Sequence, residues 1–316
     1  MSPGGPFRAW LDRSCDEAEK SVITIMDGGM GGELIRRGVG AETGLWSAEA
    51  LVSAPQAVVD THRSYIEAGA RIITTNSYSS IPSYLAKRGL ENRFIELTRL
   101  AGALARSAVE GTLETVRVAG GLPPLAESYR PDLVPTDGEA RPIYRAMAQA
   151  LEPNVDLFLC ETMSCVRESR NAAIAAKEAA RARSLPVYLS WTLSEEAEAG
   201  LRSGESIETA FASVRDLELD GFLFNCTHSD AIEHGIEILS DLTDKPIGGY
   251  PNRFVVPPGW SLDNPVEVQP RVDFGTQLFV AAAERCVQRG ASLFGGCCGI
   301  GPEDIAALTE ALGPDS

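Results

Sequence analysis

The sequence predicts an α/β protein that folds as a single (β/α)8 TIM-type barrel. Eight short, mostly apolar runs alternate with stretches of helical periodicity, and eight strands close a barrel of this kind. The runs lack the strict alternation of a sheet with one wet face, so they fit parallel strands covered on both faces. We expect one domain over residues 1–316, with its core at about 22–312.

The predicted strands are spread along the whole chain, and each is followed by a small or polar residue. They cover residues 22–26 (VITIM), 71–75 (RIITT), 116–120 (VRVAG), 156–160 (DLFLC), 187–191 (VYLSW), 221–225 (GFLFN), 246–250 (PIGGY) and 292–296 (SLFGG).

Helices are expected between these strands. Residues 54–68 carry a proline near their start and end before Gly69, while 92–110 and 167–182 are rich in Ala, Arg, Glu and Leu. Residues 303–312 form a last amphipathic helix. A doubly wound open sheet is the alternative, but the first strand leads into DGGMGGEL, which is not the GxGxxG fingerprint of that fold.

Charge and composition narrow the class of partner. The chain has 28 Lys and Arg against 44 Asp and Glu, a formal net charge of −16, which disfavours nucleic acid or an anionic membrane as partner. No apolar run approaches the roughly 20 residues of a membrane span, and residues 1–20 lack the order of a signal peptide. We expect a cytoplasmic protein that binds small molecules, and the sequence leaves homo-oligomer formation open.

Cysteines are the most informative side chains. Their number, seven, is odd, which indicates free thiols or metal ligands rather than a disulfide framework. Cys226 follows the sixth predicted strand, and Cys297 and Cys298 follow the eighth, inside GGCCG. Three thiolates with an open fourth position are typical of catalytic zinc, and soft ligands favour Zn²⁺. Spacing alone leaves open that all three are small core residues.

Other polar residues follow strands in the same way. Asp27 comes after the first strand, Asn76 after the second and Glu161 after the fourth. In a barrel these positions lie at the C-terminal rim, where active sites of this architecture are built. A helix-capping role is the alternative for Asp27 and Glu161.

The chain resembles the homocysteine S-methyltransferase family in a series of motifs that occur in the same order over about residues 22–312. They are DGGMGGEL, AGARIITTNSY, the Glu161 of CETM, the Cys226 of FNC, and GASLFGGCCGIGPEDI. The resemblance implies that Cys226, Cys297 and Cys298 bind Zn²⁺ and that homocysteine enters the open position as a thiolate. An in-line attack on a methyl group carried by a cation then gives methionine.

The resemblance also assigns residues to the rest of the acceptor. It implies that Asp27 and Glu161 receive the α-ammonium group, and that backbone N–H groups around Gly28 and Gly29 hold the carboxylate. Asn76 and Tyr78 are expected to line the pocket, with a core or turn role as the alternative. We expect the three sulfurs to converge within roughly 4 Å, the edge of a tetrahedron with Zn–S bonds of about 2.3 Å.

One segment departs from the family. Relatives that use S-methylmethionine typically carry Tyr-Pro-Asn-Ser-Gly-Glu after the seventh strand, whereas this chain continues from Asn252 with Arg253 and Phe254. We expect the Pro-rich segment 252–270, with Trp260, to contact the donor. The donor order is S-methylmethionine first, then S-adenosylmethionine, then betaine. A cover over a subunit interface is the alternative for this segment.

Two other functions remain to be weighed. A barrel lyase or aldolase with incidental cysteines needs a Schiff-base lysine, and Lys245, the only lysine near a late strand, lies at the wrong end of it. A non-catalytic, zinc-dependent thiol-binding protein would share the cysteines. His62 is expected at the surface or an interface, and Trp191 in the core rather than stacked on a donor.

Overall fold

The computed structural model describes residues 23–39, 45–195, 200–257, 260 and 269–313. Cys15, the N-terminal residues considered above for a signal peptide and most of the Pro-rich segment lie outside these ranges.

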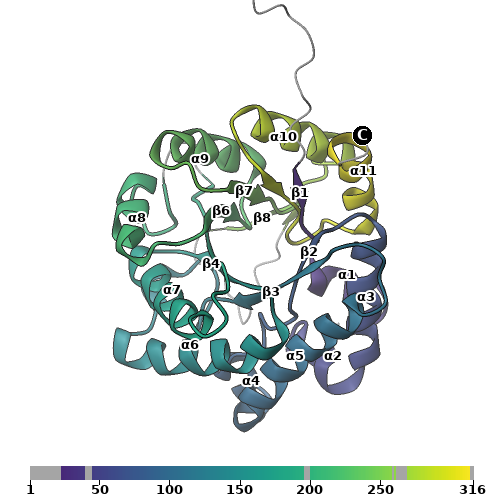
Figure 1. Cartoon of the computed structure of the whole chain (residues 1–316), viewed down its shortest axis with the longest axis vertical. Coiled ribbons are helices and arrows are strands. Elements are labelled where there is room, and N and C mark those ends of the chain that lie inside the picture. The colour runs from purple at the N-terminus through teal and green to yellow at the C-terminus, as the bar shows by residue number, and fades with distance from the viewer. Residues whose placement is uncertain (1–22, 40–44, 196–199, 258–259, 261–268, 314–316) are drawn as a thin grey trace, which may run out of the picture.

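Eight parallel strands form a closed barrel, as the sequence predicts (Figure 1). Their order around the barrel is β1, β10, β7, β6, β5, β4, β3, β2, and a parallel bridge between Met26 and Ile72 closes the ring. The doubly wound alternative is therefore wrong. The strands are β1 (Thr24–Ile25), β2 (Ile72–Thr74), β3 (Arg117–Leu122), β4 (Leu157–Met163), β5 (Val187–Trp191), β6 (Gly221–Asn225), β7 (Ile247–Tyr250) and β10 (Leu293–Phe294).

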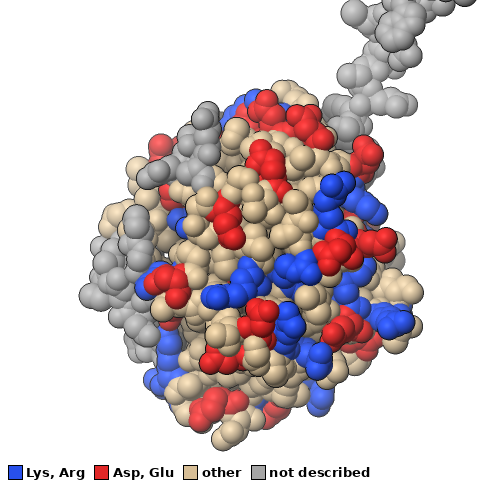
Figure 2. Space-filling view, turned by 90° about the vertical axis from the view of Figure 1, so that its left-hand side faces the viewer, with Lys and Arg blue, Asp and Glu red and all other residues tan. Residues whose placement is uncertain are grey.

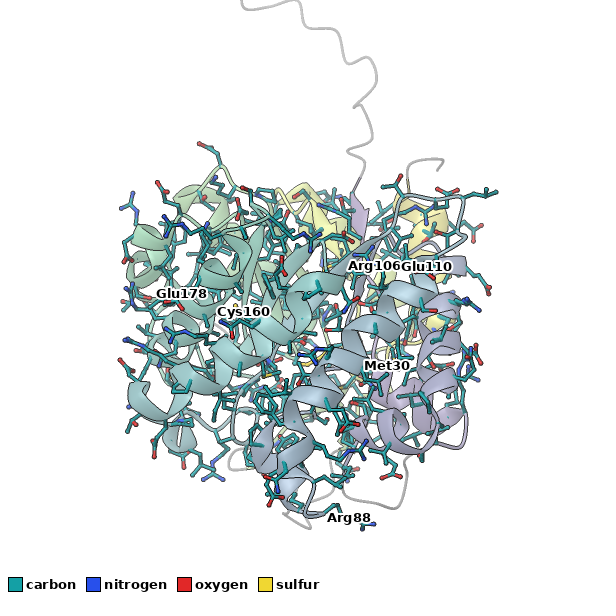
Figure 3. The ribbon with its side chains drawn as sticks, turned by 60° about the horizontal axis from the view of Figure 1, so that its bottom comes forward. Met30, Arg88, Arg106, Glu110, Cys160 and Glu178 are labelled. Carbon is teal, nitrogen blue, oxygen red and sulfur yellow. A yellow bond between two sulfur atoms is a disulfide. The ribbon has the colours of Figure 1, made fainter. Side chains whose placement is uncertain are left out.

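Helices surround the strands on the outside (Figure 1). In the side view of Figure 3, Arg106 and Glu110 lie at the end of α5, at one edge of the barrel. Arg88 lies at the opposite edge of the barrel. The helices are α1 (Met30–Arg36), α2 (Ala48–Ser53), α3 (Pro55–Glu67), α4 (Pro82–Ala86), α5 (Phe94–Val109), α6 (Asp137–Leu151), α7 (Val166–Ala180), α8 (Ile207–Val214), α9 (Ser229–Leu242), α10 (Thr276–Gln288) and α11 (Pro302–Leu312).

Side chains from the strands pack in two places, inside the barrel and between the barrel and the helices. One buried cluster joins residues of alternate strand positions, such as Ile72, Leu159 and Leu223, and a larger cluster joins the strands to the helices. Trp191 belongs to the larger cluster, where its ring stacks on Phe222 at 5.7 Å and its Nε1 donates to Ser169. The packed role of Trp191 is therefore confirmed, and this ring is not available to a donor.

His62 is a correction to the sequence analysis. We expected it at the surface or an interface, but it is fully buried in α3 within the chain itself, and burial lowers its pKa to about 3. The reason is that α3 packs against α1, α2 and α5 as well as the barrel, so that its buried face is wider than one amphipathic stripe.

A short hairpin that was not predicted from the sequence follows β7. Its strands β8 (Phe254–Val255) and β9 (Gln269–Pro270) pair antiparallel at the two ends of the Pro-rich segment. The hairpin brings Phe254, Val256 and Trp260 to the C-terminal rim of the barrel, where they line the cavity described below.

The surface carries interspersed charges. Figure 2 shows one face on which Lys and Arg alternate with Asp and Glu without a broad patch of either sign. Among the helices of the described ranges, none is long and apolar enough to cross a membrane.

Candidate active site

A cavity of about 320 Å³ opens at the C-terminal rim of the barrel. Its walls come from the ends of β2, β4 and β7 and from the segments that follow β1, β2, β3, β6, β7 and β10. The residues that the sequence analysis assigned to the metal and to homocysteine all line it except Gly29. The lining includes Asp27, Gly28, Trp46, Asn76, Tyr78, Tyr129, Glu161, Cys226, Tyr250, Asn252, Phe254, Trp260, Cys297 and Cys298.

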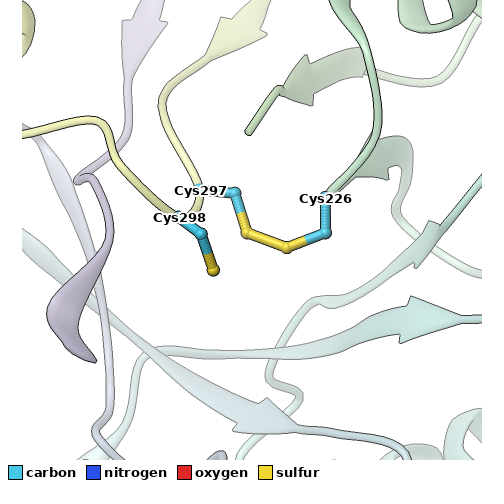
Figure 4. A group of neighbouring side chains, drawn as sticks. All are labelled: Cys226, Cys297 and Cys298. Carbon is cyan, nitrogen blue, oxygen red and sulfur yellow. A yellow bond between two sulfur atoms is a disulfide. The ribbon is translucent and has the colours of Figure 1, made fainter. Parts of the chain in front are cut away.

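The structure brings the three rim cysteines together. The Sγ atoms of Cys226, Cys297 and Cys298 all lie within 4.8 Å of one another (Figure 4). A disulfide joins Cys226 to Cys297, and the Cys298 thiol lies free beside it. We expected no disulfide here, and that expectation is wrong for Cys226 and Cys297, whose Cα–Cα separation of 5.6 Å lies in the range that suits one. The metal-ligand interpretation is unaffected, because the three sulfurs still form a group that could hold a metal ion.

Backbone conformation at these cysteines is unusual. Cys226 has a φ of 52° and Gly299 a φ of 82°, both in the left-handed region that L side chains rarely adopt. These two left-handed residues lie directly after β6 and directly after the cysteine pair. Burial raises the pKa of the Cys298 thiol to about 11. Three converging sulfurs on one wall of a cavity form a donor set that could hold a metal ion.

The two glycines after Asp27 fit against the cysteine turn. A Cβ at Gly29 would lie 2.7 Å from the carbonyl oxygen of Cys297, and one at Gly28 would overlap the carbonyl oxygen of Ile300. The N–H of Gly29 donates to Ile300 at 3.0 Å. That N–H is therefore already engaged, which is a correction to its expected role with a substrate carboxylate.

Replacement of Gly29 by Ala should displace the cysteine turn. The new methyl group meets backbone rather than a flexible side chain, so the turn at Cys297 must shift. We expect weaker metal binding by the reduced protein, measured by competition with a chelator. Gly138→Ala, at a position where a Cβ meets nothing within 4 Å, is the control. Equal metal affinity in wild type and Gly29→Ala would contradict this role.

Asp27 is held from the neighbouring strand. Its carboxylate accepts hydrogen bonds from the backbone N–H of Thr74 at 2.8 Å and from the Thr74 hydroxyl at 3.3 Å. The side chain is 6% exposed, and burial raises its pKa to about 7. The capping interpretation is wrong, because Gly29 is the N-cap of α1 and no side chain caps it.

Glu161 lies inside β4 rather than after it. The strand continues to Met163 through an irregularity between Cys160 and Met163, where Thr162 has a φ of 62°. Such a bulge re-aims a side chain, and here Glu161 lines the cavity. Its pKa is raised to about 8, first by burial and second by the charge of Asp27. The capping alternative is wrong here too, because Cys165 is the N-cap of α7, no side chain caps it, and the Val166 N–H donates to Glu205 instead.

The cavity suits a cation. Within the described part of the chain, neither Asp27 nor Glu161 has an ion pair with Lys or Arg, and none of the lining residues is Lys, Arg or His. Two buried carboxyl groups without a cationic partner are costly when ionised. A bound ammonium group would supply the missing charge.

Asn76 and Tyr78 both line the cavity, and each also contacts the protein. Asn76 donates from Nδ2 to the carbonyl of Ser47 at 3.0 Å, and its Oδ1 has no partner among the described residues. The Tyr78 hydroxyl lies 2.6 Å from the hydroxyl of Ser128. Both positions combine a structural contact with access to a ligand.

The sequence analysis missed Tyr129 and Tyr250. Tyr129 lies in the loop after β3 with a φ of 66°, and its ring centroid lies 5.9 Å from that of Trp260. Tyr250 ends β7, and its buried hydroxyl has no partner among the described residues. No local pattern distinguishes either tyrosine, although Tyr250 belongs to the Tyr-Pro-Asn run already noted.

Arg253 does not face the cavity, which corrects its expected contact with the donor. Its guanidinium donates to the buried carboxylate of Asp304 in α11 at 2.8 Å. Phe254 and Trp260 do line the cavity, as expected of this segment, whereas 258–259 and 261–268 lie outside the described residues.

Comparison with known protein families gives a match over most of the chain. The family model described as homocysteine S-methyltransferase matches residues 24–312. A homocysteine S-methyltransferase from Escherichia coli (strain K12) is 30% identical, with 98% of this chain and 99% of the relative covered. A selenocysteine Se-methyltransferase from Brassica oleracea var. italica is 27% identical, with 93% of this chain and 90% of the relative covered.

Solved structures give the same result. The metallated form of the homocysteine methyltransferase MmuM from Escherichia coli superposes with a TM-score of 0.76 at 27% identity, covering 92% of this chain and 96% of that one. The oxidized form of MmuM superposes with a TM-score of 0.75 at 29% identity, covering 91% and 95%. The resemblance drawn from the sequence motifs is confirmed.

Proposed function

Since the chain belongs to the homocysteine S-methyltransferase family, whose members are enzymes, we propose that it transfers a methyl group from a small cationic donor to homocysteine. The observation that carries the proposal is the shared cavity: three converging sulfurs and two carboxyl groups without a cationic partner open onto the same space. A thiol acceptor with an ammonium group at its other end matches both features.

Zinc is the metal we propose for Cys226, Cys297 and Cys298. Soft thiolates select Zn²⁺ over Mg²⁺ or Ca²⁺, and three protein ligands leave a fourth position for the acceptor. Bound zinc would favour the thiolate form of the acceptor sulfur, which at a free thiol pKa of about 8.5 is scarce at neutral pH. The metallated MmuM structure supports metal binding by this fold.

Asp27 and Glu161 would bind the α-ammonium group of homocysteine. An ammonium group has three N–H donors, and the Tyr250 hydroxyl, which has no other described partner, could accept the third. Gly28, Asn76 and Tyr78 would shape the pocket around the acceptor. With the acceptor held at both ends, its sulfur points toward the donor side of the cavity.

The donor would bind against the aromatic wall made by Phe254 and Trp260, because the Tyr129 ring already carries the Arg202 guanidinium at 4.9 Å from its centroid. A sulfonium or quaternary ammonium is attracted to aromatic rings, and charge disappears as the methyl group moves. The acceptor sulfur forms the new S–CH₃ bond while the donor's C–S⁺ bond breaks and its electron pair returns to the donor sulfur. With S-methylmethionine as donor, both products are methionine.

Cavity size supports S-methylmethionine over S-adenosylmethionine. At about 320 Å³ the cavity is near the lower end of the roughly 300–1,000 Å³ typical of ligand sites. Homocysteine occupies part of it, so a small donor fits better than one with a nucleoside. We propose S-methylmethionine first, then S-adenosylmethionine, then betaine.

A donor panel tests this function directly. The reduced, zinc-loaded protein is incubated with homocysteine and each of the three donors, and methionine is quantified. Methionine formation with at least one donor supports the methyltransferase. Homocysteine binding without turnover of any donor would instead favour the thiol-binding alternative. A lyase has no support, because no lysine is among the described lining residues.

Trp260→Ala should raise the KM of the donor and leave the affinity for homocysteine unchanged. A cation–π contact contributes about 0.5–2 kcal/mol, so a rise of roughly 2- to 30-fold is expected. Trp260→Phe, which keeps an aromatic ring, is the control and should retain most of the donor affinity. A change in homocysteine binding with every donor KM unchanged would assign this wall to the acceptor.

Two further expectations belong to this proposal. We propose that residues 1–316 act as one homocysteine-binding barrel domain. We propose the cytoplasm as its location, since a site made of thiolates requires a reducing compartment.

A further inference from the structure

The segment that follows β7 contacts both cysteine-bearing segments through its backbone. The carbonyls of Tyr250 and Pro251 accept hydrogen bonds from the N–H groups of Cys226 at 3.2 Å and Cys297 at 2.8 Å. The N–H of Asn252 donates to the carbonyl of Thr227 at 3.2 Å. The four-residue stretch 250–253 therefore lies between the two segments and is bonded to each.

Arg253 ends this stretch and is held at both its backbone and its side chain. Its N–H donates to the carbonyl of Cys298 at 2.8 Å, and its Nη2 donates to the Oδ1 atom of Asp304, also at 2.8 Å. Asp304 is fully buried and accepts two more hydrogen bonds, from the Thr276 hydroxyl at 2.6 Å and the Gly301 N–H at 3.0 Å. Asp304 is therefore a fixed point, because α10 and α11 both hold it.

Gly299 provides the space for this arrangement. A Cβ at Gly299 would lie 2.8 Å from the Cβ of Arg253 and 3.1 Å from the Phe254 ring. The turn after Cys298 can therefore lie directly against Arg253 only because residue 299 has no side chain. The ion pair and the cysteine turn form one packed unit.

We infer that Arg253 and Asp304 form a positioning pair for the cysteine site. The pair fixes the end of the stretch 250–253, and the backbone bonds of that stretch fix the separation between the Cys226 segment and the Cys297–Cys298 segment. Arg253 contacts no ligand atom and acts through Cys298. The inference rests on the proposed zinc site, whose affinity depends on how well the three sulfurs are placed before the metal arrives.

The test compares zinc affinity in reduced wild type and Arg253→Met by competition with a chromophoric chelator. We expect the dissociation constant to rise about 10- to 100-fold, the range seen when groups that orient metal ligands are removed. Arg253→Lys, which can still pair with Asp304, should recover most of the affinity. Cobalt(II) absorption at the same site reports the ligand geometry independently of any activity.

A matched control removes an ion pair at the other end of the barrel. Arg106 pairs with Asp156 at the same 2.8 Å, beside the end of α5 seen in Figure 3. Arg106→Met should lower the melting temperature and leave the zinc affinity unchanged. If Arg253→Met does not fold, Asp304→Asn, which keeps the shape of the side chain and weakens the pair, takes its place.

The outcomes separate this inference from the proposed function. Zinc binding as tight as wild type in Arg253→Met, with only a lower melting temperature, would show a structural pair and overturn the inference alone. If reduced wild type takes up no zinc, the proposed zinc site and the inference fail together. A weaker affinity that Arg253→Lys restores supports both.

Discussion

Replacement of Cys298 by Ser is expected to remove zinc binding and methyl transfer together. The Cys298 thiol lies within 4.8 Å of the other two sulfurs and is the one that carries no disulfide. A serine hydroxyl is a hard, weakly acidic ligand, so the variant retains two thiolates instead of three. Because loss of a group that only orients a ligand costs about 10- to 100-fold in affinity, loss of the ligand itself should cost more than 100-fold.

The measurement is the metal content of the reduced protein after dialysis, together with methionine formation. Cys165→Ser is the control: this cysteine is the N-cap of α7, where serine is a preferred residue, and it does not line the cavity. It should keep about one zinc per chain and full activity. A Cys298→Ser variant that retains zinc would refute the three-cysteine site.

The disulfide between Cys226 and Cys297 must be reduced before all three cysteines can bind zinc as thiolates. Cys226 and Cys297 cannot both serve as thiolate ligands while they are bonded to each other. We expect the protein to take up zinc only after treatment with a thiol reductant. Uptake of equal zinc before and after reduction would contradict the proposed ligand set.

The barrel and its rim could be predicted because they depend on local patterns. Each strand is a short apolar run, and the end of a parallel strand places the next side chain at the rim. This is sufficient to bring Asp27, Cys226 and Cys297 to one cavity, although they are far apart in sequence. The sequence also predicted that Trp191 would pack in the core.

The remaining features depend on contacts between distant residues. Arg253 pairs with Asp304, 51 positions along the chain, and nothing near Arg253 indicates a buried acid as its partner. The irregularity in β4 places Glu161 within the strand, and Tyr129 reaches the cavity through a left-handed backbone conformation. Hydrophobic periodicity does not encode such positions, because tertiary packing decides them.

Glu161→Gln is expected to weaken homocysteine binding and strengthen the ligand-free fold. The loss of a charge-assisted hydrogen bond costs about 1.5–3 kcal/mol, so the dissociation constant should rise about 10- to 150-fold while zinc is retained. In the ligand-free protein, however, Glu161 is a buried carboxyl group without a cationic partner, which ionises at a cost to stability. A neutral amide removes that cost.

Because ionised Glu161 favours homocysteine binding but destabilises the ligand-free fold, the two properties should depend on pH in opposite directions. The folded pKa values of Asp27, about 7, and Glu161, about 8, lie above their ordinary values of 3.8 and 4.5, so the stability these groups contribute is present at low pH. It is lost as pH rises through the folded values of about 7 and 8. Homocysteine binding should change in the opposite direction, because its ammonium group needs a carboxylate, and should tighten from pH 6 to pH 8.5.

Thermal unfolding without ligand and calorimetric titration of homocysteine, each between pH 6 and pH 8.5, measure both effects. Above about pH 8, where wild type must ionise Glu161, ligand-free Glu161→Gln should melt at a higher temperature than wild type. Its homocysteine affinity should be lower and depend less on pH. Ionisation of the acceptor thiol is common to both proteins, so the difference between their pH profiles reports the carboxyl pair.

Glu139→Gln, at an exposed position in the first turn of α6, is the control and should leave homocysteine affinity unchanged. Unchanged homocysteine affinity in Glu161→Gln would remove this carboxyl from the acceptor site. Lower affinity without higher stability would show that the cavity supplies Glu161 with a counter-charge of its own.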